Sequence, residues 1–146
     1  MNLVKPVKGL VLSAGFGTRL QPITLTCPKC LVKVGDKPIL EHWLAALQQI
    51  NCSEAIINTH YLFDKVEQYL SIRPHKRIKI TTSYEKQILG TAGTLKKHSN
   101  ALKDSTVVMM HSDNFSDIDL KDVLETHNHR PNYCLMTMVV FNSSEP

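Results

Sequence analysis

The order of short apolar runs and helix-like segments constrains the fold of this chain most. Residues 9–13, 54–59 and 106–110 have the length and composition of buried strands. Segment 38–50 follows the first run and segment 62–71 follows the second, each with apolar residues at the spacing of one helix face. Strands that alternate with helices predict a mostly parallel sheet with helices on both faces.

Three further elements complete this α/β pattern. We expect a strand over residues 77–83, a helix over 119–130 and a last strand over 133–141. With 146 residues and 42% hydrophobic content, the chain can bury one core. A single domain over residues 1–146 is therefore expected.

The composition of the chain bears on which classes of binding partner we expect. The net charge of +4 is modest and the lysines are scattered, so we expect no nucleic-acid partner, and a small anionic substrate accounts for the surplus. No apolar run approaches the roughly 18 residues of a membrane helix, so no membrane partner is expected. The N-terminus lacks the apolar core and cleavage site of a secretory signal, which favours a cytoplasmic location.

The first strand leads into the loop Ala14-Gly15-Phe16-Gly17-Thr18-Arg19. Small residues let the backbone approach a ligand closely, and clustered N–H groups after a strand suit a polyphosphate. The Thr18 hydroxyl can donate a hydrogen bond, and the Arg19 guanidinium can bind an oxyanion with two. Lys29 adds a second cation ten residues later.

Two common phosphate loops do not fit this segment. A P-loop requires Gly, four residues, then Gly-Lys-Ser/Thr, and the chain has no such run. The dinucleotide-binding pattern requires a third glycine where Leu20 stands. The pair Cys27 and Cys30 has the CxxC spacing of zinc and redox sites, but no second pair follows, so we expect ordinary thiols.

Polar residues also follow two other predicted strands. Gly90 and Gly93 flank the expected start of a helix, where free N–H groups are available. Asp113 emerges from the end of an apolar strand. Because Mg²⁺ is usually held by one or two carboxylates together with substrate phosphates, Asp113 is a candidate magnesium ligand.

One long pattern connects these features. Leu12-x-Ala14-Gly15-x-Gly17-Thr18-Arg19-Leu20-x-Pro22, then Thr24 and Pro28-Lys29, resembles the N-terminal pattern of the sugar-1-phosphate nucleotidyltransferases, or nucleoside-diphosphate-sugar pyrophosphorylases. The run 89–94 resembles the branch that activates mannose- and heptose-type sugars, the guanylyltransferases. The resemblance implies a three-layer Rossmann-like fold, incomplete at its C-terminal side.

The resemblance also implies an activity and a set of site residues. Family members transfer a nucleotidyl group from a nucleoside triphosphate to a sugar 1-phosphate, release pyrophosphate and use Mg²⁺. The residues expected to bind the nucleotide are Leu12, Ala14, Gly15, Gly17, Thr18, Glu85, Gly90 and Thr91. The residues expected to act in catalysis are Arg19, Lys29 and Asp113, with Asp113 holding the metal.

Glu85 bears on the choice of base. It stands five residues before Gly90, where many uridylyl- and thymidylyltransferases have Gln. A carboxylate only accepts hydrogen bonds, and guanine offers two adjacent N–H donors, so this position favours GTP. The alternative is that Glu85 is a solvated charge at a strand end.

Family domains continue past the length of this chain into a Glu-Lys pair that meets the sugar phosphate and a second metal-binding Asp. Two readings stay open: an active nucleotidyltransferase, or a nucleotide-binding remnant or fragment that needs a missing segment or a partner chain. Exposed sheet edges would favour a homo-oligomer.

Overall fold

A computed structural model describes residues 5–73, 75 and 77–142. The chain separates into two compact units, Met1–Ser116 and Asp117–Pro146. Each unit is described by itself. The expectation of one domain over residues 1–146 stays a prediction.

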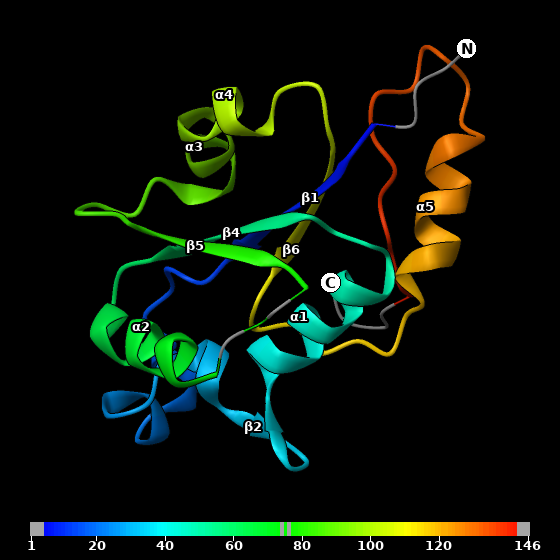
Figure 1. Ribbon diagram of the computed structural model, residues 1–146. Helices are drawn as coiled ribbons and strands as arrows, with labels where there is room; N and C mark the ends of the chain where they lie inside the picture. Colours follow the sequence, from blue (N-terminus) through cyan, green and yellow to red (C-terminus); the bar gives the residue numbers. More distant parts are fainter. Residues whose placement is uncertain (1–4, 74, 76, 143–146) are drawn as a thin grey trace. The chain divides into compact units, whose positions relative to one another are not determined.

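The first unit is built on a four-stranded sheet with the strand order β5-β4-β1-β6 (Figure 1). Its strands are β1 (Val7–Leu12), β4 (Glu54–Thr59), β5 (Lys79–Tyr84) and β6 (Thr106–His111). Every neighbouring pair is parallel, as the apolar runs predicted. The carboxyl ends of the strands therefore meet at one edge of the sheet, where open α/β folds bind ligands.

Helices and turns connect these strands. The helices of this unit are α1 (Ile39–Gln49), α2 (Phe63–Ile72), α3 (Gly90–Lys97) and α4 (Ser99–Leu102). Three 3₁₀ turns, η1 (Thr18–Leu20), η2 (Ile23–Leu25) and η3 (Lys29–Leu31), precede a hairpin of β2 (Lys33–Val34) and β3 (Lys37–Pro38). The helices predicted over 38–50 and 62–71 are confirmed within one residue at each end. Nowhere in the described parts of the chain is a helix long and apolar enough to cross a bilayer.

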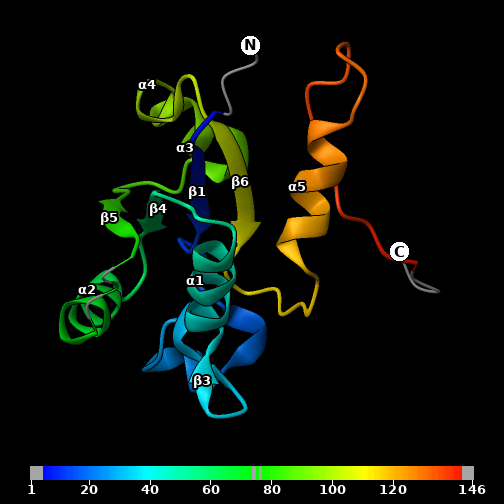
Figure 2. The same ribbon diagram turned by 45° about the vertical axis from the view of Figure 1, so that its right-hand side comes forward.

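Helices cover both faces of the sheet (Figure 2). On one face, α1 packs so closely that a Cβ built on Gly9 would lie 2.9 Å from Leu47 Cδ1. Leu10 and Leu12 point to the opposite face, because neighbouring side chains of a strand alternate. There they form a buried cluster with Leu102 of α4. The predicted three-layer α/β fold is confirmed.

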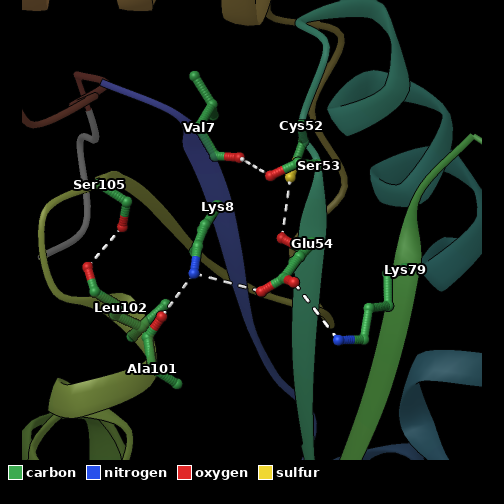
Figure 3. Close-up of polar contacts among 9 residues, drawn as sticks. All are labelled: Val7, Lys8, Cys52, Ser53, Glu54, Lys79, Ala101, Leu102 and Ser105. Carbon is green, nitrogen blue, oxygen red and sulfur yellow. Dashed lines mark hydrogen bonds and ion pairs between the residues drawn. The ribbon is translucent and has the colours of Figure 1, made fainter. Parts of the chain in front are cut away.

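Charged side chains join the amino ends of three strands (Figure 3). Lys8, Glu54 and Lys79 are register partners on β1, β4 and β5. The Glu54 carboxylate lies 3.2 Å from Lys8 Nζ and 3.4 Å from Lys79 Nζ. Lys8 Nζ also donates to the carbonyl of Ala101 at 2.7 Å, which connects α4 to β1. The hydrogen bond from Lys8 and the charge of Lys79 hold the pKa of Glu54 below its ordinary value.

The second unit contains α5 (Leu120–Asn128). Asp119 caps the N-terminus of this helix, and its carboxylate accepts the Lys121 N–H at 2.8 Å. The strand predicted over 133–141 is wrong, because the structure forms no ladder there. A strand satisfies its backbone N–H and C=O groups only beside a partner strand. Tyr133 and Phe141 are 85% and 88% exposed.

Candidate functional site

A cavity of about 190 Å³ opens at the carboxyl edge of the sheet. It is lined by residues at the ends of β1, β4 and β6, by Lys29 of η3 and by the start of α3. The lining residues are Leu12, Ser13, Ala14, Gly15, Lys29, Asn58, Ile88, Gly90, Thr91, His111, Ser112 and Asp113. Seven of these were expected in the site from the sequence: Leu12, Ala14, Gly15, Lys29, Gly90, Thr91 and Asp113.

Four expected residues do not line the cavity. Gly17, Thr18 and Arg19 lie further along the loop, where η1 turns the chain and leaves the Arg19 side chain exposed. Glu85 is 2% exposed and is therefore almost entirely covered by protein. The expected roles of these four residues stay predictions.

The two glycines of the loop differ in why the backbone needs them. Gly17 has φ 68°, and a Cβ there would lie 2.8 Å from Thr24 Cγ2. Its carbonyl accepts the Thr24 hydroxyl at 2.7 Å and the Leu20 N–H at 2.9 Å, which closes the turn. A Cβ on Gly15, by contrast, would have no protein atom within 4 Å. Gly17 therefore shapes the loop, whereas Gly15 leaves space at the cavity wall.

Lys29 and Asp113 both line the cavity and contact each other. The Lys29 ammonium donates to Oδ2 of Asp113 in an ion pair, with side chains 21% and 30% exposed. Among the residues described, no three His, Cys, Asp or Glu side chains lie close enough together to hold a metal ion. The single carboxylate fits a Mg²⁺ ion that takes its remaining ligands from water and substrate phosphates.

The start of α3 forms the wall beside Ile88. Gly90 has φ 70°, a conformation that side chains rarely adopt. The first N–H groups of a helix have no partner within the helix and carry partial positive charge. Gly90 and Thr91 present this end of α3 to the cavity. An anionic group is the ligand that such a helix start favours.

Glu85 lies behind this wall and is held by three donors. Its Oε1 accepts the Thr94 hydroxyl at 2.6 Å and Asn58 Nδ2 at 3.1 Å, and its Oε2 accepts the Leu89 N–H at 3.0 Å. Burial raises the pKa of Glu85, but these three hydrogen bonds together with Lys97 leave it below its ordinary value. Protein donors therefore use three of the roughly four acceptor positions of the carboxylate. The reading of Glu85 as a solvated charge is wrong.

Sequence reasoning missed five lining residues: Ser13, Asn58, Ile88, His111 and Ser112. Asn58 and His111 were visible as residues at the carboxyl ends of predicted strands, and this position was the available signal. The Ser13 N–H donates to Asn58 Oδ1 at 2.7 Å, so Asn58 joins the end of β4 to the start of the loop. That contact joins residues 45 positions apart and has no local signature in the sequence.

The CxxC pair consists of free thiols. Cys30 is buried, and burial raises its pKa to about 12. A thiolate, not a thiol, is the nucleophile and metal ligand. Burial of Cys30 therefore disfavours its thiolate, the form that reacts and binds metal.

Comparison with known proteins decides the family. The family model for nucleotidyl transferase matches residues 8–146. The chain belongs to the nucleotidyl transferase family. A mannose-1-phosphate guanyltransferase from Pichia angusta is 37% identical over 127 residues, which cover 83% of this chain and 34% of the relative. The catalytic subunit beta of mannose-1-phosphate guanylyltransferase from Danio rerio is 36% identical over 143 residues, or 96% of this chain and 39% of the relative.

Solved structures of other proteins agree with the fold of this chain. HddC from Yersinia pseudotuberculosis superposes with a TM-score of 0.72 at 24% identity, over 84% of this chain and 54% of HddC. The chain spans 34% and 39% of the length of the two curated relatives named above. The resemblance inferred from the opening loop is confirmed.

The cavity of this chain combines hydrogen-bond donors with one carboxylate. Backbone N–H groups of the loop and of α3, together with the Lys29 ammonium, can bind negatively charged oxygens. Asp113 stands among these donors as the carboxylate that can hold a cation. This arrangement suits the binding of a metal-complexed phosphate chain.

Proposed function

We propose that this chain binds a nucleoside triphosphate in the cavity and transfers its nucleotidyl group to a sugar 1-phosphate. The observation that carries the proposal is the ion pair of Lys29 and Asp113 in a cavity that Gly15 and the start of α3 also line. A cation, a carboxylate and two sets of backbone donors converge there from distant parts of the sequence.

The triphosphate would lie against the Gly15 backbone and the N–H groups at Gly90 and Thr91. Lys29, now paired with Asp113, would turn its ammonium to the reacting phosphates. Asp113 would hold Mg²⁺, which when bound neutralises charge on the triphosphate oxygens. Arg19, beyond the cavity wall, would meet the leaving pyrophosphate where it extends along the loop.

In the proposed reaction, a phosphate oxygen of the sugar 1-phosphate attacks the α-phosphorus of the triphosphate. The new P–O bond forms as the bond to the β-phosphate oxygen breaks, and pyrophosphate leaves. Such transfers need positioning and charge stabilisation more than a protein nucleophile. The donors around the cavity supply both.

GTP is the proposed nucleotide. The curated relatives at 36% and 37% identity are named as guanylyl- or guanyltransferases that act on mannose 1-phosphate. Mannose 1-phosphate is accordingly the first acceptor to test. The buried position of Glu85 means that direct contact with the base would use its one remaining acceptor position.

A second candidate function is nucleotide binding without turnover. The cavity contains residues assigned to the triphosphate and the metal, but the described residues include none assigned to the sugar phosphate. In this case the chain would bind Mg²⁺ and GTP and would need another segment or chain for the transfer.

Two measurements on the same preparation separate these functions. One follows pyrophosphate release from GTP and mannose 1-phosphate with Mg²⁺, and the other titrates the protein with GTP and Mg²⁺. Release together with binding supports the enzyme, whereas binding alone supports the second candidate. Absence of both would overturn the proposal.

A further inference from the structure

A buried hydrogen-bond network connects the loop after β1 with the segment between β5 and α3. It contains Asn58 at the end of β4, Glu85 after β5 and Thr94 in α3, whose exposed fractions are 3%, 2% and 0%. The Glu85 carboxylate accepts from Asn58, Thr94 and the Leu89 N–H. Asn58 in turn accepts the Ser13 N–H through its Oδ1 at 2.7 Å.

The carboxylate determines how Asn58 is oriented. A side-chain amide has a donor end and an acceptor end, and only the donor end can face a carboxylate. Because Asn58 Nδ2 donates to both Glu85 and Thr94, its Oδ1 must face the Ser13 N–H. Glu85 thereby fixes the first residue after β1 without touching it. It fixes the residue before α3 directly, through Leu89.

We propose that Glu85 is a positioning residue that holds the loop over residues 14–19 (the Gly15 loop) and the start of α3 in the geometry that binds the nucleotide phosphates. This inference rests on the function proposed above. It differs from the reading in which Glu85 recognises guanine, since a positioning role affects every nucleoside triphosphate equally.

Reversing the polarity of the network tests the proposal. In Glu85→Gln, the new side-chain NH₂ group faces another donor, either Asn58 Nδ2 or the Leu89 N–H. In Asn58→Asp, a second carboxylate faces the Glu85 carboxylate. Each single substitution should weaken binding of GTP with Mg²⁺ about tenfold, since each leaves a buried polar group unsatisfied. In the double variant the new amide donates to the new carboxylate, whose other oxygen still accepts the Ser13 N–H. Its affinity should return to within about threefold of the original protein.

The choice of nucleotide separates positioning from base recognition. Glu85→Gln should weaken the binding of GTP and the binding of UTP by the same factor, so the ratio of the two affinities stays unchanged. Glu67→Gln is the matched control, because Glu67 is exposed on α2 and does not line the cavity. A change in the GTP to UTP ratio, or a double variant as weak as the singles, would overturn the proposal.

Amide hydrogen exchange of the nucleotide-free protein gives a readout that does not need the proposed function. Glu85→Gln should speed exchange at Leu89 and also at Ser13, and the double variant should restore protection at Ser13. If Glu85→Gln does not fold, Glu85→Asp gives the same comparison, because the shortened side chain cannot reach all three donors. Failure of the original protein to bind any nucleotide would overturn the proposed function alone. Unchanged exchange at Ser13 would overturn the positioning role.

Discussion

Lys29 and Asp113 are 84 residues apart in the sequence, and the fold places them in one ion pair. Lys29 stands at the start of η3, directly after Pro28, and Asp113 stands two residues after β6 ends. Sequence pattern predicted both as catalytic residues, but the ion pair between them requires the order of the strands in the sheet. In the proposed complex the phosphates take the place of Asp113 as the partner of Lys29.

Removal of the Lys29 ammonium should therefore reduce turnover. We expect Lys29→Ala to lower the rate of pyrophosphate release by about 10²- to 10³-fold, the range seen when a group that stabilises developing charge is deleted. The control is Lys33→Ala, because Lys33 is an exposed cation on β2 outside the cavity. Equal rates for the two variants would remove Lys29 from the mechanism.

The two loop glycines give a second prediction about single residues. Gly15→Ala should leave the midpoint of urea unfolding nearly unchanged, because a Cβ there meets no protein atom within 4 Å. The same variant should weaken nucleotide binding if phosphates approach the Gly15 backbone. Gly17→Ala should lower the free energy of unfolding by about 1 kcal/mol or more, because its positive φ disfavours a side chain.

Glu85 shows how far sequence reasoning reached at this scale. The family resemblance and its position five residues before Gly90 led to the expectation that it contacts the nucleotide base, and this expectation stays a prediction. Its partners Asn58 and Thr94 lie on other elements, so its burial and its three hydrogen bonds were not visible in the sequence. The same limit hid the hydrogen bond between Ser13 and Asn58.

The apolar runs that form strands are those that pair with a neighbouring strand in the sheet. β1 lies between β4 and β6, and its central residues are fully buried, as its composition predicted. Residues 133–141 have a similar composition but form no ladder. The composition of a segment indicates whether it favours a strand conformation. A stable strand also needs a partner strand, and the segment's own sequence does not say whether one is present.

The charged side chains at the amino ends of the strands predict an acid-sensitive contribution to stability. The pKa of Glu54 is lowered in the folded protein, so the unfolded chain binds more protons and stability rises with pH in this range. The contribution is present above the ordinary pKa of 4.5 and is lost as the pH falls through the lower folded value. Urea unfolding should show Glu54→Gln less stable than the original protein at neutral pH, with the difference vanishing in acid. A constant difference would contradict the assignment.

At the scale of the whole molecule, the sheet, the cavity and the network all belong to the unit Met1–Ser116. The unit Asp117–Pro146 contains α5 and the apolar segment 133–141. Pattern reasoning predicted the parallel sheet of the first unit because short apolar runs there alternate with segments that have the period of a helix. The expectation of one domain over residues 1–146 rests on length and composition, which do not report how contacts are distributed along the chain.

The exposed apolar segment should be the first site of proteolysis. Limited digestion with chymotrypsin should cut at Tyr133, Leu135 or Phe141, which are 85%, 87% and 88% exposed, before it cuts at buried Trp43. Mass spectrometry of the early fragments identifies the sites. Early cleavage at Trp43 would show that the first unit opens before this segment is reached.

The central claim is that a metal-bound nucleoside triphosphate lies between the Gly15 loop, the start of α3 and Asp113. Amide chemical-shift mapping during a titration with GTP and Mg²⁺ tests it most directly. The account predicts saturable shifts at Gly15, Gly90, Thr91 and Asp113, and predicts that Asp113→Ala weakens them. Shifts confined to other parts of the chain, or none at saturating nucleotide, would contradict it.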